Sequence, residues 1–176
     1  MSEFIESTWE NELELNQLKC DQNEESATRV YICSPCNNDS VIKKYQNIIA
    51  ARYYMYYANK HMNVHTNAPH AYLSVLLNDK DPAERSIALE FGLKMLELCD
   101  MIFVCGTKVS NGMRGEIVKA LKMGKPVTCY HPLMKEKIDA IILEEKLDNK
   151  LFAYNHMYPV LGSNPSELIP IWRCSA

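Results

Sequence analysis

The chain has 176 residues, of which 47% are hydrophobic and 23% are charged, and its formal net charge at pH 7 is −3. This length and composition suit one α/β domain with a substantial core and exclude two ordinary domains. The basic residues are scattered, which excludes a nucleic-acid-binding surface, and no apolar run is long enough to cross a bilayer.

The start of the chain and its cysteines predict a soluble, cytoplasmic protein. The first residues are acidic and lack the basic and apolar regions of a signal peptide. The number of cysteines, seven, is odd. Several of them lie in or beside strand-like runs, which is typical of reduced core residues rather than of a disulfide framework: Cys33, Cys99, Cys105 and Cys129.

The first part of the chain predicts a leader, a strand and a long helix. Residues 1–28 are rich in Glu, Asn and Gln, so we expect an acidic, flexible leader, or a short docking helix, before a single α/β domain over residues 29–176. Residues 29–33 predict a strand that Ser34 and Pro35 end. Asp39 or Ser40 can cap a helix whose apolar residues recur at helical spacing: Ile42, Tyr45, Ile48, Ile49, Tyr53, Tyr56 and Tyr57.

Strand and helix patterns then alternate to about residue 146. A strand over 63–66 precedes a short helix over 72–77, and Asp81-Pro82-Ala83-Glu84 is a strong start for a helix that reaches about Cys99. The central strand, a helix over 112–123 that Gly124 ends, a strand over 126–130 and a helix over 135–146 follow. The proline-rich tail predicts an irregular segment with a helical turn near 166–169. This alternation predicts an α/β fold with a single doubly wound, Rossmann-like parallel sheet flanked by helices.

The stretch from Cys99 to Ile117 predicts a buried strand, a Gly/Ser/Asn loop and the start of a helix. Such a turn places loop amides and a helix N-terminus at the carboxyl edge of a parallel sheet, where open α/β folds bind ligands. Its glycine spacing matches neither a Walker A loop nor the dinucleotide fingerprint. Glu116 has two interpretations: an acid placed favourably near a helix start, or a carboxylate nucleophile that attacks a sugar carbon.

Two other features reach the same sheet edge. Cys33-Ser34-Pro35-Cys36 has the spacing of a redox or half-zinc motif, but no second Cys/His pair completes a zinc site. We interpret these as loop cysteines, expect neither a metal nor a cofactor, and assign the loop amides to a phosphate or ribose oxygen. His70 follows a strand and a proline, and is either a ligand contact or a satisfied structural histidine.

The order of these motifs resembles the nucleoside 2-deoxyribosyltransferase superfamily, including an uncharacterised bacterial and phage branch known only as a domain of unknown function. The resemblance covers about residues 29–130. It is carried by four short runs in sequence order: Tyr31-Ile32-Cys33, Pro69-His70, Leu98-Cys99-Asp100 and Ser110-x-Gly112-Met113-x-x-Glu116-Ile117.

The resemblance implies roles for these residues. In the transferases and in the related deoxynucleoside 5′-monophosphate N-glycosidases, the glutamate that matches Glu116 attacks the anomeric carbon, releases the base and forms a glycosyl-enzyme intermediate. Ser110 matches a serine with which the N-glycosidases contact the 5′-phosphate, where the transferases have an aspartate. The resemblance therefore favours a nucleotide over a free nucleoside. The expected substrate-binding residues are Tyr31, Cys33, Ser34, Pro35, His70, Ser110, Asn111, Gly112 and Met113.

One departure from the superfamily concerns the second carboxylate. The N-glycosidases carry a catalytic aspartate eight residues before the position of Asp100, and this chain has Gly92 there. Asp100 itself is interpreted as structural. The replacement candidates are Asp79, Asp81 and Glu84, followed by Glu90 and Glu97. The resemblance also implies a homo-oligomer, because relatives build active sites at subunit contacts.

The sequence thus supports two hypotheses about a nucleotide or nucleoside ligand. The first is an enzyme, an N-glycosidase or 2-deoxyribosyltransferase, that cleaves or transfers the N-glycosidic bond of a nucleoside 5′-monophosphate through Glu116. The alternative is a non-catalytic module whose same pocket binds or sequesters a nucleotide or an ADP-ribose-type signal. Glu116 and Ser110 favour the enzyme, whereas Gly92 favours the binding module.

Overall fold

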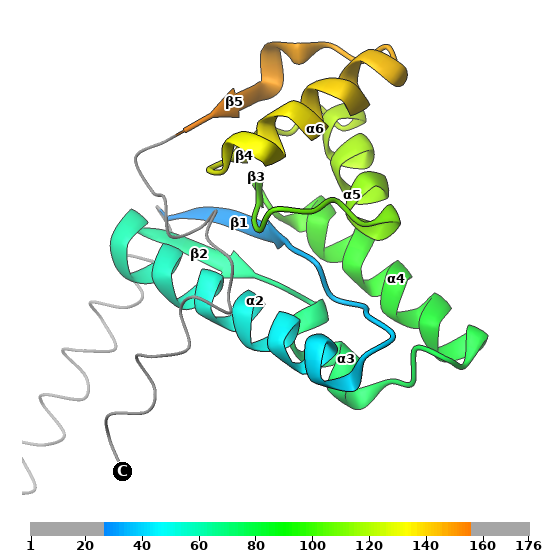
Figure 1. Ribbon diagram of the computed structural model, residues 1–176. Coiled ribbons are helices and arrows are strands. Elements are labelled where there is room, and N and C mark those ends of the chain that lie inside the picture. The colour runs from blue at the N-terminus through cyan, green and yellow to red at the C-terminus, as the bar shows by residue number, and fades with distance from the viewer. Residues whose placement is uncertain (1–26, 156–176) are drawn as a thin grey trace, which may run out of the picture.

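The computed structural model describes residues 27–155 and contains a five-stranded sheet in which every strand pair is parallel (Figure 1). The strand order is β2-β1-β3-β4-β5. The strands are β1 (Thr28–Cys33), β2 (Val64–Asn67), β3 (Met101–Val104), β4 (Val127–Cys129) and β5 (Phe152–Tyr154). The predicted α/β fold with a doubly wound parallel sheet is confirmed. The predicted leader, up to residue 26, and the helical turn near 166–169 lie outside the described residues.

The strand order reverses beside β1. The chain passes from β1 outward to β2 and then returns across β1 to β3, so that Thr28 of β1 pairs with Val64 while Cys33 of β1 pairs with Val104. Open α/β sheets bind ligands in the crevice at such a switch point, outside the carboxyl ends of the strands. The loops that follow β1 and β3 therefore occupy the position where a site is expected.

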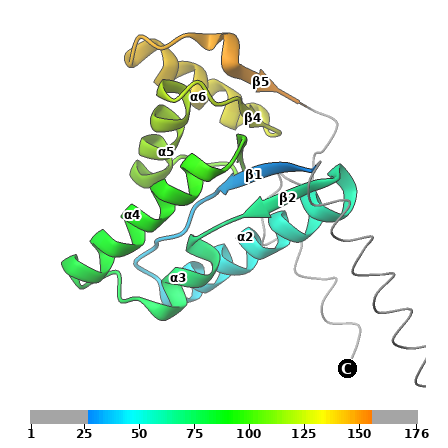
Figure 2. The same ribbon diagram turned by 180° about the vertical axis from the view of Figure 1, so that it is seen from behind.

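Helices cover both faces of the sheet (Figures 1 and 2). Alternate residues of the strands point to opposite faces. On one face, Val30, Ile32 and Phe103 pack against α2 (Val41–Met62) and α3 (His70–Leu76). On the other face, Ile102 and Val104 pack against α4 (Pro82–Leu98), α5 (Asn111–Lys122) and α6 (Pro132–Glu144). A short 3-10 turn (Asn149–Leu151) leads into β5.

The cysteines predicted to be core residues are buried free thiols: Cys33, Cys99, Cys105 and Cys129. They fill small spaces between the sheet and the helices. Among the described residues, no helix combines the length and the apolar character that crossing a membrane requires.

The predicted start of α4 and the predicted stop of α5 are observed, whereas α6 spans Pro132–Glu144 rather than the predicted 135–146. Asp81 caps α4 and Pro82 occupies its first turn, while Gly124, with a φ of 73°, follows the end of α5. Lys125, in the turn after α5, donates to the carbonyl oxygens of Glu97 and Cys99, so this ammonium group neutralises the C-terminal end of α4.

Asp100 has the structural role that the sequence predicts. Its carboxylate accepts a hydrogen bond from the backbone amide of Arg29 at 2.8 Å and pairs with the guanidinium of the same residue at 2.9 Å. These bonds join the start of β3 to the start of β1, at the edge of the sheet opposite to the loops that follow these strands.

Two sequence predictions about the fold are wrong. The apolar face predicted for the first helix includes Ile42 and Tyr45, whose exposed fractions are 71% and 61%. The sheet is instead covered by small residues of α2 and by Tyr54, because a helix that approaches a sheet closely needs small side chains at the contact: Ala50, Ala51 and Ala58. The second error is β5, which lies in the segment that was predicted to be irregular after residue 146.

The N-cap of α4 provides a test of the fold. The Asp81 carboxylate accepts from the amides of Ala83 and Glu84. Asp81→Ala leaves both amides without this acceptor, so we expect a loss of about 1 kcal/mol in the free energy of unfolding and a fall in Tm of about 2–4 °C. Asp81→Asn is the control, because asparagine caps helices about equally well, and urea melts compare the variants. Equal losses in both variants would contradict the capping role.

Candidate active site

A cavity of about 300 Å³ opens where β1, β2 and β3 end. Its walls come from the loop after β1, the start of α3, the middle of α4 and the first turns of α5. It lies at the switch point of the sheet and has the size of the smaller ligand pockets in proteins.

Glu116 lies on this cavity and receives its main hydrogen bond from the sheet. The Tyr31 hydroxyl on β1 donates to Glu116 Oε1 at 2.9 Å, whereas the Cys33 thiol donates to the carbonyl oxygen of Met113 at 4.0 Å. Burial raises the pKa of Glu116 above its ordinary value, and the nearby Cys33 thiol and Tyr31 hydroxyl offset part of this rise. Burial and the nearby Glu116 charge raise the pKa of Tyr31 well above its usual range, so its hydroxyl stays protonated and remains a donor.

The first turn of α5 forms the wall beside Glu116. Ser110 is the N-cap, and its Oγ accepts from the Met113 amide at 3.3 Å. The Ser110 side chain is exposed on the cavity, so its hydroxyl proton can point to a ligand while the oxygen caps the helix. Since the N-terminal end of a helix carries a partial positive charge, this wall favours an anionic group.

His70 lines the cavity and also makes a hydrogen bond within the protein. It begins α3, lines the cavity, and its Nε2 lies 2.8 Å from the Oγ of the buried Ser34. Burial lowers the pKa of His70 to about 4, so the imidazole is neutral at pH 7. The His70–Ser34 bond fixes the loop after β1 against α3.

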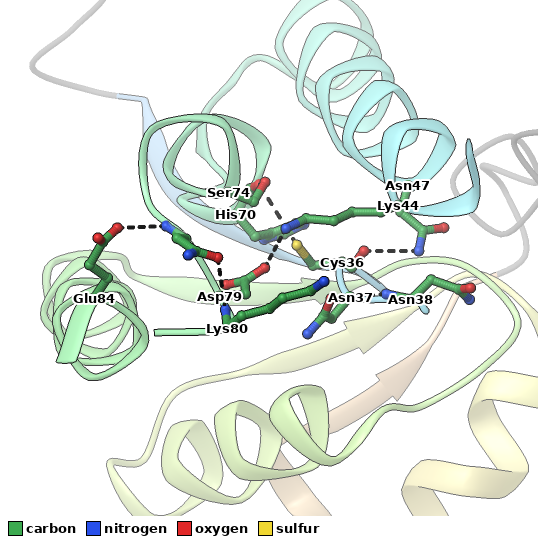
Figure 3. Close-up of polar contacts among 11 residues, drawn as sticks. Cys36, Asn37, Asn38, Lys44, Asn47, His70, Ser74, Asp79, Lys80 and Glu84 are labelled. Carbon is green, nitrogen blue, oxygen red and sulfur yellow. Dashed lines mark hydrogen bonds and ion pairs between the residues drawn. The ribbon is translucent and has the colours of Figure 1, made fainter. Parts of the chain in front are cut away.

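The part of the cavity between α2, α3 and α4 carries the other charges. Asp79 pairs with Lys44 at 2.6 Å, which ties the loop before α4 to α2 (Figure 3). Asn47 Nδ2 donates to the carbonyl oxygen of Cys36 at 3.1 Å and holds the loop after β1 on α2 (Figure 3). Arg85 lines the cavity from α4, and its guanidinium makes no ion pair or hydrogen bond with any described residue.

Most of the predicted site residues line this cavity together: Tyr31, Ser34, His70, Ser110, Asn111, Gly112, Met113 and Glu116. Two do not. Cys33 is fully buried beneath the cavity, where its thiol donates to the carbonyl oxygen of Met113. Pro35 lies on the other side of its loop, where it lines a second cavity.

Gly92 faces the cavity from α4 and brings no carboxylate to it. The residues that could supply a carboxylate in its place differ in whether they reach the cavity. A Cβ at Gly92 would lie 3.4 Å from the Tyr31 hydroxyl oxygen, so this position adjoins the Tyr31–Glu116 pair. Of the candidates, only Asp79 lines the cavity. The others bind backbone amides or exposed lysines: Asp81, Glu84, Glu90 and Glu97 (Glu84 in Figure 3). Within residues 27–155, no group of three or more potential metal ligands occurs.

Sequence reasoning missed Arg85, Ala88 and Leu89 of α4 as cavity residues. The available signal was helical spacing from Gly92, because Arg85, Ala88 and Leu89 precede it by seven, four and three residues and therefore share its face. Leu73 and Ser74 also line the cavity, and nothing in their local sequence marks them, whereas Asn37 lines it from the loop after β1 that the sequence assigns to the ligand.

The strand order and the cavity at its switch point define a doubly wound α/β protein. Within this class, the chain belongs to the family described as a domain of unknown function (DUF7768), whose model matches residues 28–130. The matched region contains every residue named above that lines the cavity beside Glu116.

Two solved structures are similar to this chain. One is a 2-deoxyribosyltransferase from the psychrotolerant bacterium Bacillus psychrosaccharolyticus, with 17% identity and a TM-score of 0.45 over 60% of this chain and 73% of that chain. The other is a conserved protein from Enterococcus faecalis V583, with 18% identity and a TM-score of 0.42 over 82% of this chain and 96% of that chain. No curated protein matches. The fold assignment rests on the strand order of this chain itself.

The neutral state of His70 predicts a dependence of stability on pH. Its pKa is about 4 in the folded chain, against an ordinary value of about 6.5. Between these values the unfolded chain binds a proton that the folded chain does not, so stability falls as the pH falls from about 6.5 to about 4, by up to about 3 kcal/mol. His70→Gln should flatten this part of the curve, whereas a substitution of the exposed His65 should not. Urea melts at a series of pH values measure both, and parallel curves would contradict the assignment.

Proposed function

We propose that this protein cleaves or transfers the N-glycosidic bond of a nucleotide, with Glu116 as the nucleophile. The observation that carries the proposal is the hydrogen bond of 2.9 Å from Tyr31 to Glu116 Oε1 within a cavity whose adjoining wall is the N-terminus of α5. A carboxylate held by one oxygen presents its other oxygen to the cavity in a fixed direction. The motif order that resembles the nucleoside 2-deoxyribosyltransferases supports the same role.

The chemistry follows from this arrangement. The free oxygen of Glu116 attacks the anomeric carbon, the bond from this carbon to the base nitrogen breaks, and its electron pair leaves with the base. The resulting glycosyl ester is then attacked by water or by a second base, which returns Glu116 as a carboxylate. Ser110, the first turn of α5 and the loop from Ser34 to Asn37 hold the 5′-phosphate opposite the reacting carbon.

One observation favours the alternative, a module that binds a nucleotide without chemistry. Gly92 places no carboxyl group beside Glu116, and Asp79 is engaged by Lys44 at 2.6 Å. A base that needs a proton in order to leave would receive none from either position. In the alternative, the same cavity holds the nucleotide and the bond stays intact.

We also propose that two copies associate through α4, beside the cavity. Only Gly92 and Leu96 of this helix are buried, while Ile87 and Leu98, eleven residues apart and therefore on one outward face, are each 59% exposed. An exposed apolar face of this kind is typically buried against a partner. Leu89, on the face of α4 that lines the cavity, is 53% exposed.

The test of catalysis compares variants of Glu116. We expect the wild type to release free base from at least one nucleoside monophosphate in a panel of ribo- and deoxyribonucleotides. Glu116→Ala and Glu116→Gln should lower the rate at least about 10³-fold, because both remove the nucleophile. Chromatography of the released base measures the rates. Base release that persists in both variants rules out the nucleophile, and tight binding with no release in the wild type supports the binding module.

Tyr31→Phe tests the hydroxyl that hydrogen-bonds to Glu116. The bond from Tyr31 lowers the pKa of Glu116, so its loss should move the acid limb of the activity profile to higher pH. Tyr45→Phe removes the same hydroxyl from an exposed position on α2 and should leave the profile unchanged.

The association through α4 has its own test. Ile87→Arg and Leu98→Arg place charges on the exposed apolar face and should convert a dimer into a monomer in sedimentation equilibrium. Val41→Arg, at a position on α2 that is 82% exposed, is the control and should leave the dimer intact. A wild type that is monomeric at all concentrations contradicts the proposal.

A further inference from the structure

A second cavity, of about 560 Å³, lies on the other side of the loop that follows β1. It is bounded by that loop, by α2 and by the loop from Gly106 to Ser110. Ser34, Asn37 and Ser110 line both cavities, so the second cavity adjoins the one that holds Glu116 along these residues.

The charges of the two cavities differ. The second cavity is lined by Lys43 and Lys108, and neither lysine makes an ion pair in the described part of the chain. Its described lining contains no aspartate or glutamate, but it does contain the amide side chains of Gln46 and Asn47. We call it the lysine cavity. Two exposed ammonium groups without an ion pair, on the same lining as the Gln46 amide, suit phosphate oxygens rather than a neutral sugar.

The residues that line both cavities determine the orientation of a ligand that would fill both. A nucleotide whose anomeric carbon faces Glu116 would direct its 5′-phosphate to Ser110 and the loop from Ser34 to Asn37. Beyond these residues lies the lysine cavity, so a second phosphate on the first would continue into it. With a larger volume than the Glu116 cavity, this space has room for a further group attached to the second phosphate.

The Glu116 cavity limits the kind of base that can leave. A neutral base departs readily only when a side chain protonates it. Of the described groups on this cavity, the Tyr31 hydroxyl donates to Glu116 and the Cys36 thiol lies 3.9 Å from the carbonyl oxygen of His70. The His70 ring carries no positive charge at pH 7, Asp79 is paired with Lys44, and Arg85, which also lines the cavity, has a guanidinium that does not give up a proton. A base that already carries a positive charge needs no donor.

From these two features we infer that the substrate is a pyrophosphate-linked dinucleotide whose reacting base is a cationic N-glycoside, such as a pyridinium ring. The inference rests on the proposed glycosidic function and names its substrate class. Glu116 bonds to the anomeric carbon, the carbon–nitrogen bond breaks, and its electron pair neutralises the ring nitrogen, so the base leaves without a proton. Water then attacks the same carbon, Glu116 leaves as a carboxylate, and one proton passes to solvent.

The experiment compares three probes with the full-length chain: nicotinamide adenine dinucleotide, nicotinamide mononucleotide, and a panel of neutral purine and pyrimidine monophosphates. We expect kcat/KM to be highest for the dinucleotide, lower for the mononucleotide and lowest for the neutral bases. The double variant K43Q/K108Q should lower the ratio of dinucleotide to mononucleotide kcat/KM about tenfold or more. Lys137→Gln removes the same charge from an exposed position on α6 and should leave the ratio unchanged.

Binding measurements separate this inference from the glycosidic function. In Glu116→Gln, which retains the cavity but lacks the nucleophile, ADP-ribose should bind at least about tenfold more tightly than ribose 5-phosphate, and the difference should shrink at high salt. If neutral monophosphates are cleaved fastest and both sugars bind equally, the substrate class is wrong while the function stands. If ADP-ribose is preferred but no probe releases base, the function fails and the phosphate subsite stands. Equal kcat/KM for the dinucleotide and the mononucleotide overturns the proposal that the lysine cavity binds the second phosphate.

Discussion

The site depends on the partial burial of one carboxylate, Glu116, against β1. Removing a carboxylate from water is costly unless a donor compensates it, and here the donor is the Tyr31 hydroxyl on β1, with the Cys33 thiol nearby. Because side chains alternate along a strand, Tyr31 and Cys33 point to the α5 face while Val30 and Ile32 pack on α2. One strand thus builds half of the core with one set of residues and compensates the buried charge with the other. A shift of one residue in the pairing of β1 and β3 would turn Tyr31 to the other face and remove the donor from Glu116.

Ion pairs and hydrogen bonds that do not involve Glu116 hold the helices around the cavity together. Lys44 joins α2 to the loop that carries Asp79, and Lys125 closes the end of α4 from the turn after α5. Arg114, from the turn of α5 that precedes Glu116, pairs with Glu144 and Glu145 at the end of α6. Partly exposed pairs of this kind contribute little to stability one by one. Their effect is to fix the positions of the walls around the carboxylate.

Much of the fold is local in origin and was predictable from sequence. Strand runs, the Asp81-Pro82 helix start and the Gly124 stop are decided within a few residues, and the structure reproduces them. The buried face of α2 was not predictable in this way. Its contact with the sheet uses alanines and Tyr54, while large residues such as Ile42 stay exposed, so counting large apolar residues selects the wrong face. β5 has only three residues, and its pairing with β4 is a tertiary contact with no local signature. In the site, motif residues could be named in advance, but Arg85 enters the cavity only through the packing of α4 on the sheet.

The rigidity of the loop after β1 affects how a ligand binds rather than how it reacts. It is pinned to α3 through the Ser34–His70 bond and to α2 through the bond from Asn47 to Cys36, and Pro35 lies so close to Gly106 that a Cβ there would come within 3.1 Å of the proline ring. A loop held at three points cannot move so as to enlarge one of the two cavities and narrow the other. Two chemical groups joined across it would therefore bind as a bivalent pair, in which the first group to dock raises the effective concentration of the second. Two weak contacts, one in each cavity, would then together favour ligands whose linker has the length that joins the two cavities.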